Sequence, residues 1–355
     1  MTPRFHPLRI AEIRRECPDA ISLRFEVPEP LLRDYVFVQG QHVTLKATVA
    51  GEEVRRSYSI CSGIDDGELR VAIRAVPGGV FSNWATRTLA VGDTLEVMTP
   101  DGRFHTSLDP ARARHYVAFA AGSGITPILS LIKTTLKREP RSRFTLIYGN
   151  RSTASTLFLE DLEDLKDRYL RRFVLHTVFS REPQDIELFH GRLDGPKVRI
   201  FLAALVPVAT IDEVFVCGPG EMIDTVAQTL AEAGVPEGHV HVERFGVPSG
   251  AATNAPAPED APQAVIEIEL DGVRRDVAFR STDASVLDAA LRAGLDLPYS
   301  CKGGMCCTCR AKLLGGKVRM AKNYSLDPAD VAAGYILTCQ SHPLTERLAV
   351  SFDVR

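Results

Sequence analysis

The sequence has no long apolar run and no marked excess of positive charge. None of its segments approaches the ~18 consecutive apolar residues that a membrane-spanning helix needs, so a membrane protein is not expected. The formal net charge of −3 leaves no basic footprint for nucleic acid. No apolar leader follows Met1, and disulfide frameworks belong mainly to small secreted domains. This chain of 355 residues is therefore expected to work in the cytoplasm, as two or three domains.

Four of the eight cysteines follow a spacing that is typical of an iron–sulfur site. Cys301, Cys306, Cys309 and Cys339 are separated by four, two and twenty-nine residues, which is the plant-type pattern for a [2Fe-2S] cluster. Structural zinc usually takes two short cysteine or histidine pairs, and only one such pair is present here. The pattern therefore favours a one-electron carrier over zinc or disulfides, and Cys307 is interpreted as a bystander thiol in the same loop.

The part of the chain that carries these cysteines is set off by a change in composition. A stretch with four prolines and no periodicity predicts a linker over residues 248–263. Beyond it, apolar and charged residues alternate over 266–270, Asp271-Gly272 predicts a hairpin turn, and helical periodicity covers 285–292. This order predicts an α+β domain of the β-grasp ferredoxin type over residues 264–355.

Strands alternate with helices over residues 109–247, which predicts a doubly wound parallel sheet. A strand at 115–120 runs into a glycine-rich turn at 122–127 and then a helix at 128–137, an arrangement that lets a pyrophosphate lie against a helix N-terminus. Further strands are predicted at 144–148, 173–179, 213–217 and 239–245. Because ligands bind at the carboxyl ends of such strands, one crevice is expected to be lined by residues 149–151, 180–181 and 217–219.

Residues 1–108 show short strand patterns separated by turn signals and no long helical periodicity, which predicts a small antiparallel β-barrel. Two segments within it stand out for chemistry. They are Arg-Ser-Tyr-Ser at 56–59 and Gly-Gly-Val-Phe-Ser-Asn-Trp at 78–84. Taken alone, the first segment is better interpreted as an edge strand and the second as a turn.

Taken together, the ordered motifs resemble a known superfamily. In chain order they are Arg-x-Tyr-Ser at 56–59, Gly-Gly-x-x-Ser at 78–82, Gly-Ser-Gly-Ile-Thr-Pro at 122–127, Cys-Gly-Pro at 217–219, Glu-Arg-Phe at 243–245 and the four spaced cysteines. This order is similar to the ferredoxin–NADP reductase superfamily with a fused C-terminal ferredoxin domain. The stretches 5–8, 40–61, 323–326 and 333–335 further resemble the reductase subunits of phenylacetyl-CoA 1,2-epoxidases, which are multicomponent di-iron oxygenases of phenylacetate breakdown.

The resemblance implies a flavin iron–sulfur oxidoreductase that takes a hydride from NAD(P)H onto FAD and releases single electrons through the cluster. Arg56 would contact the flavin pyrophosphate, Tyr58 would lie along the flavin ring system, and Ser59 would lie near its N5 atom. The implied cofactor-binding residues are Arg56, Tyr58, Ser59, Arg74, Gly78, Gly79, Val80, Ser82, Gly122, Ser123, Gly124, Thr126, Arg151, Ser180, Arg181, Cys217, Gly218 and Pro219. The implied catalytic residues are Ser59, Cys217, Glu243 and Phe245, and the implied cluster ligands are Cys301, Cys306, Cys309 and Cys339.

NADPH is favoured over NADH as the electron donor. Ser180-Arg181 is similar to the Ser-Arg pair that binds the 2′-phosphate in plant-type reductases, and Arg151 would add a second cation. No acidic residue is evident where an NADH enzyme would bind the 2′-hydroxyl. The alternative is that both arginines are solvated surface charges.

The implied partners are the di-iron oxygenase subunits of a multicomponent complex. The same chemistry serving another oxygenase, a desaturase or a hybrid-cluster protein is the alternative. A redox sensor without enzymatic activity would not need three intact nucleotide motifs. The surface around the cluster loop is predicted to face an acidic acceptor, because it is basic and includes Lys302, Met305, Lys312, Lys317 and Arg319.

Overall fold

The computed structural model describes residues 3–245 and 264–354. The predicted linker at 248–263 lies outside the described residues. The described chain forms two compact units, a larger one of residues 6–54 and 58–245 and a smaller one built mainly on residues 264–354. Within these ranges no helix has both the length and the apolar character that crossing a membrane requires.

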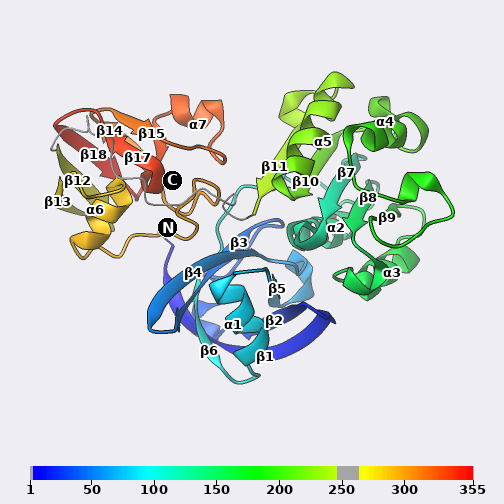
Figure 1. Ribbon diagram of the computed structural model, residues 1–355, viewed down its shortest axis with the longest axis horizontal. Coiled ribbons are helices and arrows are strands. Elements are labelled where there is room, and N and C mark those ends of the chain that lie inside the picture. The colour runs from blue at the N-terminus through cyan, green and yellow to red at the C-terminus, as the bar shows by residue number, and fades with distance from the viewer. Residues whose placement is uncertain (1–2, 246–263, 355) are drawn as a thin grey trace. The chain divides into compact units, whose positions relative to one another are not determined.

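The larger unit begins with a six-stranded antiparallel sheet in the order β4-β3-β6-β1-β2-β5 (Figure 1). Ile60, just after β4, pairs with Val71 of β5, so the two edges of the sheet meet and the expected barrel is confirmed. Helix α1 (Val80–Thr88) buries Phe81 and Ala85 in the barrel core. The strands are β1 (Phe5–Cys17), β2 (Ala20–Glu26), β3 (His42–Val49), β4 (Glu52–Ser59), β5 (Leu69–Arg74) and β6 (Thr94–Met98).

A parallel sheet of five strands follows, in the order β11-β10-β7-β8-β9. Alternate residues of β7 enter two separate cores, since Tyr116 and Ala118 pack with α2 and α3, whereas Val117 and Phe119 pack with α4 and α5. Helices therefore cover both faces, and the doubly wound prediction is confirmed (Figure 1). The elements are β7 (His115–Ala121), α2 (Ile125–Arg138), β8 (Arg143–Asn150), α3 (Leu159–Arg168), β9 (Phe173–Phe179), α4 (Gly195–Ala204), β10 (Glu213–Gly218), α5 (Gly220–Glu232) and β11 (Val240–Arg244).

The strand order of this sheet determines where a ligand can bind. The chain leaves the central strand β7 toward β8 and β9, then returns to place β10 on the other side of β7. The connections after β7 and β10 diverge at this point, which opens a crevice at their carboxyl ends. The residues that follow these strands, from Gly122 and from Pro219, are those that the sequence motifs single out.

The smaller unit has a mixed sheet in the order β13-β12-β18-β14-β16 and a two-stranded sheet β15-β17. Helix α6 (Val286–Arg292) starts at Ser285, whose hydroxyl accepts a hydrogen bond from the Asp288 amide. The predicted hairpin, helix and cysteine loop are all present in this order. The remaining elements are β12 (Ala264–Leu270), β13 (Val273–Phe279), β14 (Arg310–Gly315), β15 (Val318–Met320), α7 (Pro328–Ala332), β16 (Tyr335–Leu337), β17 (Ser341–Pro343) and β18 (Arg347–Ser351).

Candidate active site

A cavity of about 710 Å³ lies at the carboxyl edge of the parallel sheet. A cavity of this size suits a cofactor-sized ligand. Its wall comes from the loops after β7, β8, β9 and β10, together with Arg74 of the barrel and Phe245. The predicted site residues among its lining are Arg74, Gly122, Ser123, Gly124, Arg151, Ser180, Arg181, Gly218, Pro219 and Phe245.

The glycine-rich turn after β7 forms the floor of this cavity. Gly122 has a φ of +56°, and a Cβ added to Gly124 would overlap the carbonyl oxygen of Cys217. The turn η3 (Gly122–Gly124) therefore packs directly on β10 and passes into α2, and no side chain caps the start of either element. Such a helix start favours a phosphate group, so these residues fit the pyrophosphate of a dinucleotide.

Asn150 lies in the wall of the same cavity. The residue is only 8% exposed, and its amide nitrogen and oxygen are both buried. Burial raises the pKa of the neighbouring Tyr148 hydroxyl, and the Asn150 side chain opposes this shift. Asn150 therefore belongs to the packed part of the wall.

Four arginines line the cavity, Arg74, Arg151, Arg181 and Arg192, and they differ in their partners. The Arg151 guanidinium lies 2.9 Å from the Asp19 carboxylate, which also pairs with Arg74. The Arg181 and Arg192 side chains make no ion pair with any described residue. Sequence reasoning missed Arg192, because its place in the cavity wall depends on a loop that a single parallel bridge between Phe179 and His190 holds beside β9.

Two carboxylates also line the cavity, Asp194 and Glu221, and the first has a structural use. The Asp194 carboxylate caps α4 by accepting a hydrogen bond from the Lys197 amide. Glu182, which follows Arg181, accepts hydrogen bonds from the amide and the hydroxyl of Thr153 at 2.8 and 2.7 Å. Glu182 is thus held by the loop that follows β8.

The four predicted catalytic residues come together where the barrel meets the parallel sheet. The Ser59 hydroxyl donates to the Glu243 carboxylate at 3.2 Å, and Cys217 on β10 lies in register with Glu243 on β11. Phe245 packs against the core that contains Cys217. Burial raises the pKa of Glu243 to about 8, although the Ser59 hydrogen bond acts in the opposite direction. Burial and the nearby Glu243 also raise the pKa of the Cys217 thiol.

The predicted flavin residues lie on β4 and at the start of α1. Arg56, Tyr58 and Ser59 are on β4, and the Tyr58 ring lies 5.8 Å from the Phe81 ring of α1. Gly79 precedes α1, and a Cβ there would overlap the Ser82 hydroxyl, so the turn is tight. No side chain caps the start of α1, which is the kind of helix start that favours a phosphate. Gly78 and Val80 flank this turn. An aromatic ring beside a phosphate-binding helix start fits a flavin nucleotide.

Two of the residues predicted to bind the nicotinamide nucleotide do not line the cavity. The Thr126 side chain is buried, and its hydroxyl donates to the Ser123 carbonyl at 3.0 Å. Cys217 is fully buried behind the glycine-rich turn. Thr126 therefore shapes the turn from behind.

The four spaced cysteines form two pairs. The Cys301 and Cys306 thiols share a hydrogen bond, and Cys309 interacts with Cys339 in the same way. In residues 3–245 and 264–354, no three His, Cys, Asp or Glu side chains converge as a single-ion site requires. Two thiol pairs instead fit a two-iron cluster, which takes four cysteine ligands.

The backbone around Cys301, the first member of the first pair, favours thiolate. Gly303 N–H donates to Cys301 Sγ at 3.3 Å. The hydrogen bond from the Cys306 thiol and further backbone N–H groups lower the pKa of Cys301 to about 6, while burial opposes the shift. Cys307 points elsewhere, since its thiol donates to the Ser325 carbonyl at 3.3 Å. The loop therefore suits an anionic sulfur group at Cys301.

Comparison with known proteins agrees with this division of the chain. Family models match the oxidoreductase FAD-binding domain over residues 7–106, the oxidoreductase NAD-binding domain over 119–228 and the 2Fe-2S iron-sulfur cluster binding domain over 268–344.

Two curated relatives are similar along nearly their whole length. The chain is 47% identical to a 1,2-phenylacetyl-CoA epoxidase subunit of Escherichia coli (strain K12), covering 99% of this chain and 98% of that one. It is 35% identical to the ferredoxin reductase component of 3-ketosteroid-9-alpha-monooxygenase from Rhodococcus rhodochrous, covering 97% and 96%. Among solved structures, phthalate dioxygenase reductase has the same fold, with a TM-score of 0.59 at 24% identity and 98% of each chain covered.

The fold and the site thus define an NAD(P)H-dependent flavin iron–sulfur oxidoreductase. The chain belongs to the ferredoxin–NADP reductase family with a fused C-terminal [2Fe-2S] domain, whose members include reductase components of oxygenase systems. The expected cofactors, FAD, NAD(P)H and a [2Fe-2S] cluster, are confirmed at this level. The cytoplasmic location, the domain boundaries and the roles of single residues stay predictions.

Proposed function

We propose that this protein is the reductase of a phenylacetyl-CoA 1,2-epoxidase and passes electrons from NADPH through FAD and the [2Fe-2S] cluster to a di-iron oxygenase. The observation that carries the proposal is the 47% identity to the epoxidase subunit over 99% of the chain. The ketosteroid and glycine betaine monooxygenase reductases, at 30 to 36% identity over similar lengths, are more distant. The difference favours the epoxidase as acceptor.

The residue roles belong to the proposal. Arg56 and the α1 start would hold the flavin pyrophosphate, and Tyr58 would lie along the flavin ring. Ser59 and Glu243 would border the flavin N5 atom, and their 3.2 Å hydrogen bond supports a shared site. Phe245 would cover the flavin until the nicotinamide arrives. Phe245 lines the cavity, whereas Arg56, Tyr58 and Ser59 lie on strand β4 of the barrel. These positions support the proposed roles.

NADPH is the proposed donor because the cavity has unneutralised positive charge. Arg181 and Arg192 line the cavity together with Ser180, and neither makes an ion pair with a described residue. A 2′-phosphate dianion would pair with such guanidinium groups through charge-assisted hydrogen bonds. Arg151 contributes less than the sequence suggests, because Asp19 neutralises it.

The cluster loop is the proposed exit for electrons. Lys317 and Arg319 are exposed on the smaller unit, whereas Lys302 pairs with Asp288 at 2.8 Å and Lys312 donates to the Ala333 carbonyl. Together with Met305 this surface would suit an acidic face of the oxygenase. Lys317 and Arg319 are the side chains with most freedom to reorient toward a partner.

The test is NADPH consumption by the FAD- and cluster-loaded protein with the purified di-iron oxygenase, with and without phenylacetyl-CoA. We expect consumption to rise several-fold only when oxygenase and thioester are both present. A ketosteroid monooxygenase oxygenase component serves as the matched control acceptor. If a dye is reduced readily while the epoxidase components change nothing, the reductase chemistry holds and the assigned acceptor is wrong.

A further inference from the structure

Helix α2 joins the dinucleotide loop to the flavin-type barrel. Its first residue, Ile125, follows the glycine-rich turn at the cavity floor. Lys133 lies about 12 Å further along the helix axis, at a rise of about 1.5 Å per residue. There the helix meets the turn η2 (Ile64–Asp66), which belongs to the barrel. One rigid element therefore contacts both halves of the larger unit.

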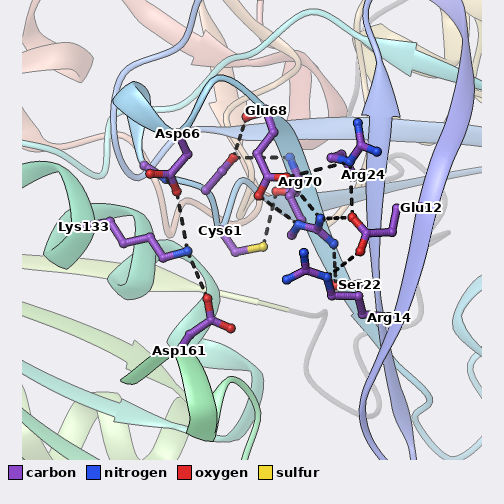
Figure 2. Close-up of polar contacts among 12 residues, drawn as sticks. Glu12, Arg14, Ser22, Arg24, Cys61, Asp66, Glu68, Arg70, Lys133 and Asp161 are labelled. Atoms are coloured by element: carbon purple, nitrogen blue, oxygen red, sulfur yellow. Dashed lines mark hydrogen bonds and ion pairs between the residues drawn. The ribbon is translucent and has the colours of Figure 1, made fainter. Parts of the chain in front are cut away.

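Lys133 is the central residue of this contact. Its ammonium lies 3.1 Å from the Asp161 carboxylate on α3 and 3.5 Å from the Asp66 carboxylate on the barrel turn (Figure 2). The Lys133 side chain is 18% exposed. Burial opposes its charged form, but the two carboxylates outweigh this and raise the pKa of Lys133. A shielded charge thus bridges the barrel and the nucleotide domain.

Further contacts hold the same turn against the same helix. The Ile64 amide donates to the Thr134 hydroxyl at 3.1 Å, and the Arg138 guanidinium makes two contacts with the Asp65 carboxylate, at 2.9 and 3.0 Å. A Cβ added to Gly63 would lie 2.9 Å from Lys133 Cβ, so the turn touches the helix directly. We call Asp65, Asp66, Lys133, Thr134 and Arg138 the interdomain clamp.

The barrel side of the clamp is itself held in place. The guanidinium of buried Arg70 contacts Glu68 at 3.0 Å and Glu12 at 2.6 Å, and the carbonyl of Arg70 accepts from the Cys61 amide (Figure 2). The Ser62 hydroxyl donates to the Glu68 carbonyl at 2.9 Å. The chain on both sides of the turn is therefore anchored to the sheet.

Both elements that form the clamp, the turn η2 and the helix α2, are close in sequence to residues proposed to contact a cofactor. The turn η2 comes a few residues after Ser59, which contacts Glu243 at the proposed flavin edge. The helix α2 begins at the loop that fits the nucleotide pyrophosphate. Hydride transfer requires reacting atoms about 3–3.5 Å apart, and a misplacement of about 1 Å costs roughly 100-fold in rate.

We propose that the interdomain clamp sets the approach of the nicotinamide ring to the flavin, and that Lys133 is a positioning residue for hydride transfer. In the step it serves, the nicotinamide C4–H bond breaks, two electrons and a proton pass together to flavin N5, and the oxidised nucleotide leaves. No further reactant is needed. The inference rests on the NAD(P)H and flavin chemistry of the family, and it depends neither on the acceptor nor on the choice of nucleotide.

The first test compares Lys133→Met with Lys46→Met in the FAD-loaded protein. Lys46 is a matched control, because it pairs with Glu96 at 3.8 Å within the barrel and its side chain is 19% exposed. NADPH and the protein are mixed rapidly without oxygen and without an acceptor. We expect Lys133→Met to lower the limiting rate of flavin reduction by about 10- to 100-fold while nucleotide affinity changes by less than about threefold. Lys133→Arg should restore most of the rate, and Lys46→Met should leave it unchanged.

A second measurement does not depend on activity. Hydrogen exchange at the Ile64 amide, which donates to Thr134, should accelerate in Lys133→Met and in Asp66→Asn, while exchange along β5 stays as in the unmodified protein. An unchanged limiting rate despite faster exchange would overturn the proposal and leave the clamp a purely structural contact. So would a rate loss equal to that of the Lys46 control.

The variant Arg138→Met provides a second test of the proposal in case Lys133→Met does not fold. The Arg138 side chain is 43% exposed, so the change removes a clamp contact without opening the core. We expect a smaller fall in the limiting rate, of about threefold or more, with unchanged FAD content. A limiting rate identical to that of the unmodified protein would contradict the proposal.

Discussion

The residues around the dinucleotide cavity are Arg74 of the barrel and several strand ends between Ala121 and Phe245, whereas the four cysteines of the smaller unit lie within one stretch from Cys301 to Cys339. The floor of the cavity is made largely of backbone, since two glycines and a helix start form it. The cysteine loop depends on four side chains. Removing one cysteine side chain from the loop should therefore reduce activity strongly, whereas removing one side chain from the cavity should reduce it moderately. In the cavity, the substitution with the strong effect should be one whose added atoms clash with the backbone.

The largest effect should come from Cys306→Ser, which removes one thiol of the Cys301 pair. Because the cluster needs four thiolates, we expect loss of its visible and paramagnetic signatures and at least about a 100-fold loss of electron delivery to a one-electron acceptor. Flavin reduction by NADPH should stay within about twofold. Cys307→Ser is the matched control and should keep the cluster, because its thiol faces the Ser325 carbonyl. Loss of the cluster in the Cys307 variant alone would reverse the assignment.

Gly124→Ala tests the backbone side of the comparison. The added methyl would overlap the Cys217 carbonyl, and overpacking of this kind costs about 1–3 kcal/mol. We expect a lower thermal midpoint and at least about a tenfold loss of kcat/KM for NADPH, with the cluster spectrum intact. Gly238→Ala is the control, since nothing lies within 4 Å of its added Cβ. Equal behaviour of the two variants would show that the turn tolerates a side chain.

Arg192→Ala tests how far one side chain matters in the cavity. A hydrogen bond to a charged group contributes about 1.5–3 kcal/mol, so kcat/KM for NADPH should fall about 10- to 100-fold while that for NADH stays the same. Arg199→Ala, which breaks a surface pair with Glu232, should change neither. If the unmodified protein does not distinguish the two nucleotides, the proposed donor is wrong. If it does and Arg192→Ala keeps the preference, only the role of Arg192 is wrong.

The last effect concerns stability alone and should have the least influence on catalysis: it is the pH dependence that Glu243 gives to unfolding. Burial raises the pKa of Glu243 to about 8 in the folded protein, from 4.5 for an exposed carboxyl. The folded state therefore keeps this proton where the unfolded chain has lost it. Relative to Glu243→Gln, the unmodified protein should lose stability as the pH rises from about 4.5 to about 8, and no further above that. Thermal unfolding of both proteins without nucleotide, from pH 5 to 9, measures this difference. Glu237→Gln is the surface control, and the same pH trend in both variants would contradict the assignment.

Much of the fold could be predicted because its signals are local. The strand at Phe173–Phe179 lies where its apolar pattern places it, and α6 begins at the capping residue Ser285. The helix predicted to start at residue 128 begins three residues earlier, at Ile125, because the glycine-rich turn passes directly into it. Turn residues and periodicity act over a few positions, which is why boundaries shift while the elements remain.

The site was only partly predictable for a related reason. The motif glycines and the four cysteines carry their chemistry in their spacing. Arg192 carries no such signal, because the sequence of the loop between Arg181 and Arg192 has no pattern that predicts where the loop runs. The reduced role of Arg151 could not be foreseen either, since its partner Asp19 lies on the turn between β1 and β2.

The sequence by itself determined the cysteine spacing, the glycine-rich turn before a helix, and the order of barrel, parallel sheet and ferredoxin-type domain. These features depend on residues that are close in the sequence, so they can be predicted without knowing how the chain packs. Only the tertiary structure decided that Ser59 donates a hydrogen bond to Glu243, that Arg192 lines the same cavity as Arg181, and that Lys133 lies between Asp66 and Asp161. Those contacts join distant parts of the chain, and their distances follow from how the strands and helices pack against one another.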